Sequence, residues 1–221
     1  MSKVAVLLSG GLDSTVACAL ANSTEDLALT ISVNYSQRHV RELESANYIS
    51  SYYGVPNITI DLSSWGRQLK GSALTDASIN VPSGCYTDMN MSLTAVPNRN
   101  ATFLMAAVGI AYSYNIDEVW VAVHSGDHNL YADCRVDFIE SIMKTAELST
   151  EYKVSIKAPF VNMDKKDIIS LGVSLGAPLD RTWSCYKGGV LHCGVCGTCK
   201  ERLESFRSLR FIDPVIYMEG L

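Results

Sequence analysis

The chain has 221 residues, and 18 Lys and Arg against 23 Asp and Glu give a formal net charge of −5. Hydrophobic residues make up 48% and charged residues 19%, as in an ordinary globular domain with its own core. The acidic balance argues against a broad basic surface for nucleic acid, and no apolar run is long enough to predict a membrane span or a signal peptide. We therefore expect a cytoplasmic protein without a direct nucleic-acid or membrane partner.

Short apolar runs alternate with longer amphipathic stretches in the first part of the chain. Strands are predicted at 3–8, 28–35 and 57–60, and helices at 14–21 and 39–53. Such alternation is typical of right-handed βαβ units, in which a parallel sheet is covered by helices on both faces. The sequence thus predicts a doubly wound, Rossmann-like α/β fold.

The regular pattern lapses between Asp61 and Asn98, where a partly ordered loop or lid near a site is expected. It then returns, and the predicted elements are helices at 100–114, 134–148 and 200–209, strands at 118–123 and 154–157, and a helix that begins at Lys165 with Asp164 as its N-cap. We expect a nucleotide-binding domain over residues 1–180 and a small metal-binding segment over residues 181–221.

A glycine loop, Ser9-Gly10-Gly11-Leu12-Asp13-Ser14, stands between the first strand and the first helix. Two glycines allow a tight turn whose N–H groups approach an anion, and the start of the following helix adds a partial positive charge. A phosphate or pyrophosphate is the predicted guest, with Asp13 holding loop amides or a Mg²⁺ ion. The loop lacks the Gly-Lys-Ser/Thr ending of a Walker loop. An ordinary strand-to-helix turn is the alternative.

Four of the seven cysteines crowd near the C-terminus as C-x7-C-x2-C-x2-C, namely Cys185, Cys193, Cys196 and Cys199. Cys-x2-Cys spacing brings two thiolates to one tetrahedral centre, so a closed structural zinc site is predicted, with an iron–sulfur cluster as the alternative. His192 is a neighbour that could replace one ligand. The remaining cysteines are expected to be buried small apolar residues or loop residues: Cys18, Cys85 and Cys134.

The hexapeptide SGGLDS directly after an N-terminal strand resembles the signature of the N-type ATP pyrophosphatases, the PP-loop superfamily. This resemblance implies cleavage of ATP between its α- and β-phosphates, transfer of AMP to a carbonyl oxygen, and a need for Mg²⁺. It also implies an ATP-binding segment made of Leu8, Ser9, Gly10, Gly11, Leu12, Asp13, Ser14, Thr15, Val16, Ala17 and Cys18.

Further motifs narrow the resemblance, namely YSQRH at 35–39 with Glu42, VPNRN at 96–100, HSGD at 124–127, YADCR at 131–135 and TWSCY at 182–186. In this order they resemble the 7-cyano-7-deazaguanine (preQ0) synthase family of the queuosine pathway. The resemblance implies that 7-carboxy-7-deazaguanine, ammonia and ATP give the nitrile through an adenylated carboxylate, an amide and an adenylated amide, and it suggests a homodimer. Asn98 replaces a usual glycine, and Val136-Asp137 replaces a usual Pro-Glu, which leaves an altered substrate preference open.

The same resemblance favours catalytic roles for Asp13, Ser14, Arg99, Asp133 and Arg135, beside Lys165 as a further cation and Asp127 as a further acid. Each has a plainer alternative. Arg99 and Asn100 could cap a helix, Asp133 could be the N-cap of the helix at Cys134, and Arg135 and Lys165 could be solvated. His39 with Glu42 could be a surface pair, and Trp183 and Tyr186 could pack on the metal segment rather than on a purine-like ring.

Three rival functions remain open. One is a variant enzyme that stops at 7-amido-7-deazaguanine for DNA modification. Another is a PP-loop enzyme that modifies tRNA, which the acidic charge and short length disfavour. The third is a zinc-ribbon interaction module without activity, which would leave SGGLDS unexplained.

Overall fold

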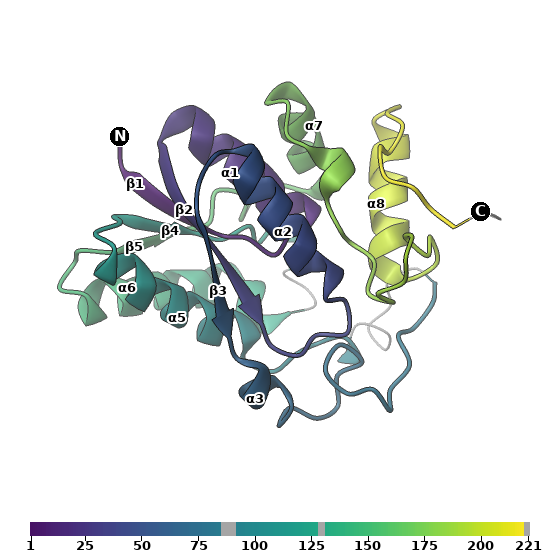
Figure 1. The fold of residues 1–221 in the computed structure, drawn as a ribbon, viewed down its shortest axis with the longest axis horizontal. Coiled ribbons are helices and arrows are strands. Elements are labelled where there is room, and N and C mark those ends of the chain that lie inside the picture. The colour runs from purple at the N-terminus through teal and green to yellow at the C-terminus, as the bar shows by residue number, and fades with distance from the viewer. Residues whose placement is uncertain (85–91, 128–130, 219–221) are drawn as a thin grey trace.

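A computed structural model describes residues 1–84, 92–127 and 131–218 of the chain (Figure 1). Parallel strands form one sheet in the order β3-β2-β1-β4-β5. The strands are β1 (Lys3–Leu7), β2 (Asp26–Asn34), β3 (Asn57–Asp61), β4 (Glu118–Trp120) and β5 (Ser155–Lys157). Since β1 lies in the centre and the chain winds away from it in both directions, the predicted doubly wound α/β fold is confirmed.

Helices cover both faces of the sheet (Figure 1). The helices are α1 (Leu12–Thr24), α2 (Arg41–Tyr52), α3 (Ser63–Gly66), α5 (Arg99–Ser113), α6 (Val136–Ser149), α7 (Lys165–Ser174) and α8 (Gly197–Ser208). Helices α1, α2, α7 and α8 pack on one face, whereas α5 and α6 pack on the other. None of the helices in the described ranges has the length and apolar character to cross a bilayer.

The two cores follow from the alternation of side chains along β1. Val4 and Val6 point into the core shared with α1 and α7, and Ala5 points into the core shared with α5 and α6. All three are completely buried. A strand buried on both faces has one continuous apolar run, which is why the sequence predicted β1 so directly.

Two boundary predictions were wrong. The strand expected at 118–123 ends its ladder at Trp120, because its partner β5 is only three residues long. The helix expected from Cys134 begins at Val136, after a 3-10 turn at Ala132–Cys134. Asp133 is therefore not the N-cap of that helix, and Arg135 occupies the N-cap position instead. By contrast, Asp164 caps α7 as predicted and forms a capping box with Asp167.

Gly10 joins the end of β1 to α1 in the left-handed region, with φ of +85°. A Cβ atom at this position would clash with the carbonyl oxygen of Glu42 and lie 2.8 Å from the amide nitrogen of Ala46. The first turns of α2 therefore pack directly on the glycine loop. Only glycine satisfies both the φ value and the space.

We expect Gly10→Ala to destabilise the protein more than Gly71→Ala. Gly71 has a φ of +86°, and among the described residues no atom lies within 4 Å of where its Cβ would be, so its substitution costs only backbone strain, about 1–2 kcal/mol. Gly10→Ala should cost ~1–3 kcal/mol more, because the backbone of α2 must also shift. Urea unfolding of both variants measures the difference, and equal losses would contradict close packing of α2 on the loop.

Candidate active site

A cavity of about 240 Å³ lies at the carboxyl ends of β1, β2 and β4. Its walls come from the glycine loop, the segment after β2, the start of α5, the segment after β4, and residues around the cysteine cluster. In doubly wound sheets, ligands bind at this edge, where the winding direction reverses. The fold therefore places the predicted phosphate loop in the expected position for a ligand.

Hydroxyl groups brace the glycine loop from within. The Gly11 N–H donates to Ser9 Oγ at 3.2 Å, and the Ser9 and Ser14 hydroxyls are 3.0 Å apart. Ser14 and Thr15 hydroxyls both donate to the Gly11 carbonyl, at 3.2 and 2.8 Å. No side chain in the described part of the protein caps the start of α1, so its first N–H groups remain available to an anion at this end of the helix.

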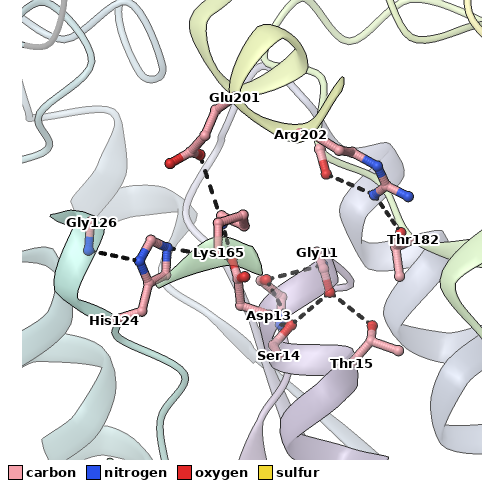
Figure 2. Close-up of polar contacts among 12 residues, drawn as sticks. Gly11, Asp13, Ser14, Thr15, His124, Gly126, Lys165, Thr182, Glu201 and Arg202 are labelled. Carbon is pink, nitrogen blue, oxygen red and sulfur yellow. Dashed lines mark hydrogen bonds and ion pairs between the residues drawn. The ribbon is translucent and has the colours of Figure 1, made fainter. Parts of the chain in front are cut away.

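Four charged or polar side chains from distant segments converge beside the loop (Figure 2). Lys165 Nζ lies 2.7 Å from Asp13 Oδ2 and 3.8 Å from a carboxylate oxygen of Glu201. His124 Nε2 lies 3.9 Å from the same Asp13 oxygen. Burial alone would raise the pKa of Asp13, but Lys165 and His124 outweigh it and lower this pKa below its usual value.

His124 has a defined tautomer in this arrangement. Its Nδ1 accepts the Gly126 N–H at 3.1 Å, so in the neutral ring Nε2 carries the proton and faces Asp13. The other oxygen of Asp13, Oδ1, is buried and has no hydrogen-bond partner among the described residues. An unpartnered carboxylate oxygen in a cavity is a suitable ligand for a hard cation such as Mg²⁺.

Arg99 opens α5 and lines the same cavity as the loop. Burial would lower the pKa of its guanidinium, but Tyr35, Tyr186 and Asp133 outweigh burial and raise that pKa, so the cation stays charged. Burial in turn raises the pKa of Tyr35 to about 12, which keeps its phenol neutral. The site therefore holds fixed positive charge from both Arg99 and Lys165.

Asp133 and Arg135 lie next to the cavity but do not line it among the described residues. Asp133 Oδ2 accepts the Asn100 N–H at 2.9 Å, and the Asn100 side chain donates to the Asp133 carbonyl at 3.0 Å. Asp133 thus fixes the start of α5 and, through it, Arg99. Arg135 is exposed. Catalytic roles for Asp133 and Arg135 stay predictions, and Asp127 lies in a 3-10 turn at Ser125–Asp127.

The four clustered cysteines come together as predicted, with all Sγ atoms within 4.8 Å of one another. The Cys193 N–H points to Cys185 Sγ at 3.4 Å, and the Cys196 N–H points to Cys193 Sγ at 3.3 Å. Amide donors to thiolates and a closed set of four sulfurs fit one tetrahedral metal ion. His192 accepts the Ser184 N–H at 3.2 Å and is not in this ligand set.

The remaining cysteines do not join this centre within the described part of the chain. Cys18 and Cys134 are buried, as predicted, and Cys85 lies outside the described residues. Within the predicted ATP segment, the cavity-lining residues are Leu8, Ser9, Gly11, Leu12, Asp13 and Ser14. The rest of that segment is buried: Gly10, Thr15, Val16, Ala17 and Cys18.

The cysteine segment also builds the cavity wall. The Trp183 N–H donates to the Gly10 carbonyl at 2.9 Å, and Ser184, Tyr186 and Glu201 line the cavity. Arg202 also lines the cavity; it is buried and forms a two-point ion pair with Asp213 at 2.8 and 2.9 Å. Trp183 and Tyr186 pack against the cysteine cluster, as the plainer alternative expected, and also line the cavity, while stacking on a purine-like ring stays a prediction.

Sequence reasoning missed or undervalued several residues of this site. Lys165 is not a solvated lysine, because its side chain is only 14% exposed, and His39 is not a surface residue, because it is 2% exposed. Glu201 and Arg202 carried no motif at all. The one usable signal was the Asp164 cap, which fixes Lys165 at the first position of α7 and so directs it towards the loop.

The sheet, the SGGLDS loop and the cavity define a nucleotide-binding α/β protein of the PP-loop class. Residues 3–210 match the family described as "Queuosine biosynthesis protein QueC", and the chain belongs to this family. A "7-cyano-7-deazaguanine synthase" of Allorhizobium ampelinum is 45% identical over 97% of this chain and 92% of its own length. A protein of the same name from Caldicellulosiruptor saccharolyticus is 41% identical over 97% of this chain and 95% of its own length.

Solved structures share the fold at much lower identity. The structure titled "predicted subunit of tRNA methyltransferase" from Methanocaldococcus jannaschii has a TM-score of 0.52 and 15% identity, and covers 78% of this chain and 75% of its own. This similarity concerns the fold alone.

We expect Lys165→Met to raise the pKa of Asp13 from its depressed value, because the ammonium group is the main offset to burial. A carboxyl group whose pKa is lower in the folded than in the unfolded state stabilises the fold at pH values above its unfolded pKa. This stabilisation is lost as the pH falls through the pKa of the folded state. The stability difference between wild type and variant should therefore be larger at pH 7 than at pH 3. Urea unfolding at both pH values measures it.

Lys166→Met is the matched control, because Lys166 is 52% exposed and pairs with Asp164 at the surface. It should show little change at either pH. An Asp13 carboxyl that titrates identically by carbon NMR in wild type and Lys165→Met would disprove the electrostatic role of Lys165.

Proposed function

We propose that this protein converts 7-carboxy-7-deazaguanine, ammonia and ATP into 7-cyano-7-deazaguanine, as a ligase that forms carbon–nitrogen bonds. The family membership and the names of its relatives support this proposal. The observation that carries it is the SGGLDS loop at the cavity floor, with uncapped helix N–H groups and Asp13 paired to Lys165. Such a floor suits retention of the pyrophosphate that leaves when the carboxylate takes up AMP.

In the proposed reaction, the substrate carboxylate attacks the α-phosphorus of ATP, and pyrophosphate leaves towards the loop and the start of α1. Backbone N–H groups and the ammonium of Lys165 stabilise the charge that develops on pyrophosphate. Arg99, held charged at the cavity wall, orients an anionic group of the substrate or the nucleotide. Ammonia then displaces AMP to give the amide, and a second adenylation removes the amide oxygen.

Two metal ions complete the proposal. Asp13 Oδ1 would hold a Mg²⁺ ion, which when bound offsets phosphate charge. The four cysteines would hold one Zn²⁺ ion with a structural role, because a complete thiolate set leaves no open position for water or substrate. Clustered thiols of this kind also favour a reducing compartment, so the cytoplasm is the proposed location. A homodimer is proposed on the resemblance alone.

The two departures from the family pattern give no support to an enzyme that stops at the amide. Asn98 replaces glycine at φ of +56°, a left-handed conformation that asparagine adopts more readily than other side chains. Val136 replaces proline at the first position of α6, where proline is favoured but not required. Both changes are accounted for by the local backbone, and neither places a new group among the described residues that line the cavity.

We expect the purified protein to release AMP and pyrophosphate, and to accumulate the nitrile from the carboxy substrate with ATP and ammonium. Mass spectrometry of the products at increasing times measures this. Persistent amide without nitrile would favour the amide-forming variant, and ADP with orthophosphate would rule out the proposed chemistry.

We expect about one Zn²⁺ per chain, and its loss in Cys196→Ala, because three thiolates hold the ion poorly. Elemental analysis of the purified proteins measures it, with Cys18→Ala as the control, since Cys18 is equally buried but outside the cluster. Iron with acid-labile sulfide in the wild-type protein would replace the zinc assignment by an iron–sulfur cluster.

A further inference from the structure

His39 is a buried imidazole in the cavity wall with one nitrogen left unpartnered. The residue is 2% exposed and lines the same cavity as the glycine loop. Its Nε2 lies 3.1 Å from Glu42 Oε2, one helical turn further along. Its Nδ1 is buried and has no hydrogen-bond partner within the described ranges.

The pairing with Glu42 fixes what Nδ1 can do. A carboxylate only accepts, so Nε2 carries the proton, and in the neutral ring Nδ1 is an acceptor with a free lone pair. Leaving such an acceptor buried and unpaired is unfavourable, and buried polar groups without partners are rare. A group kept in this state at a cavity wall is suited to receive a hydrogen bond or a proton from a ligand.

The surroundings fix the ring in place. Its centroid lies 5.4 Å from the ring of Tyr186, which belongs to the cysteine segment. The backbone of Gly188 packs so closely on residues 38–39 that a Cβ atom there would lie 2.8 Å from the Arg38 carbonyl oxygen. On the other side, the first turn of α2 packs on Gly10 of the loop. The imidazole therefore lies beside the loop expected to hold the nucleotide phosphates.

Other basic atoms at this cavity are already engaged. His124 Nδ1 accepts the Gly126 N–H, and Lys165 is an ammonium paired with Asp13. Burial keeps the Tyr35 phenol protonated, with a pKa of about 12. Among the described residues that line the cavity, His39 is the nitrogen base that combines an orienting carboxylate with an unfilled, buried lone pair.

We propose that His39, oriented by Glu42, is the general base for the attack of ammonia on the adenylated carboxylate. This inference rests on the proposed function. The ammonia lone pair forms the new C–N bond, and one N–H proton passes to His39 Nδ1. The C–O bond to AMP breaks, and its electron pair leaves with AMP. Glu42 stabilises the imidazolium that forms, as carboxylate–histidine pairs do in other catalytic sites.

The two halves of the reaction separate this role from a structural one. Transfer of AMP to the substrate carboxylate needs no base at His39. Exchange of pyrophosphate into ATP, measured with the carboxy substrate and without ammonia, therefore reports adenylation alone. Amide formation with ammonium reports the second half. Hydroxylamine, a stronger nucleophile of similar size, traps the same adenylate with less need for a base.

The test variant is His39→Gln, whose amide can still donate to Glu42. We expect exchange and hydroxylamine trapping within about twofold of wild type, and amide formation reduced roughly 100-fold or more, the usual contribution of a general base. Glu42→Gln should show a smaller loss of amide formation with exchange unchanged. Tyr53→Phe is the matched control, because it removes another buried unpartnered polar atom outside the cavity, and it should retain full activity.

Three results would overturn the role of His39. Unchanged amide formation in His39→Gln would show that no base is needed there. Equal losses of exchange, trapping and amide formation would show that His39 binds nucleotide or supports the fold. If His39→Gln fails to fold, the folded Glu42→Gln variant replaces it in the test. Unchanged amide formation in that variant would likewise overturn the role of the His39–Glu42 pair. Absence of exchange in the wild-type protein, in contrast, would refute the proposed function itself.

Discussion

The close contact at Gly10 is the constraint on which the rest of the site depends. Its φ of +85° turns the chain from β1 into α1, and its missing side chain lets the backbone of α2 pack on the loop. Its carbonyl accepts the Trp183 N–H at 2.9 Å, which ties the cysteine segment to the same point. Three segments far apart in sequence therefore meet at one backbone unit, and the glycine loop, the His39–Glu42 pair and the cysteine segment share one cavity as a result.

The electrostatics of the cavity differ from those of the whole chain. The net charge is −5, yet the cavity presents the start of α1, Lys165 and Arg99 to a ligand. Asp13, which its depressed pKa keeps ionised, pairs with Lys165 and offsets part of that positive charge, so the cavity holds paired charges at fixed positions. Positive groups fixed before a polyanion arrives need little reorganisation when charge develops, which is the usual source of electrostatic catalysis. A small cavity with fixed charged groups, in a protein that has no net basic charge, favours a small anionic substrate over a nucleic acid.

Local sequence predicted the parts of the molecule that local chemistry determines. The apolar run of β1, the SGGLDS turn, the Asp164 cap and the cysteine spacing each depend on residues close in the chain, and the structure has all of them. The errors came where a partner far away decides the outcome. Asp133 looked like a cap for its own helix, but its carboxylate accepts an N–H at the start of α5, from Asn100, 33 residues away. Periodicity does not reveal such a contact.

The burial of His39 and of Arg202 was hidden for the same reason, since both are covered by segments that the sequence places elsewhere. Tyr186 and Gly188 cover His39, and Asp213 neutralises Arg202 in the cavity wall. One covering segment lies between Cys185 and Cys193, and the other follows Cys199. The four-cysteine cluster therefore does more than close a hairpin, because the same segment of backbone places Trp183, Tyr186 and Glu201 at the cavity. A protein of this size can bury a sufficient core without such a cluster, so we infer that the cluster serves to hold this wall of the cavity rigid.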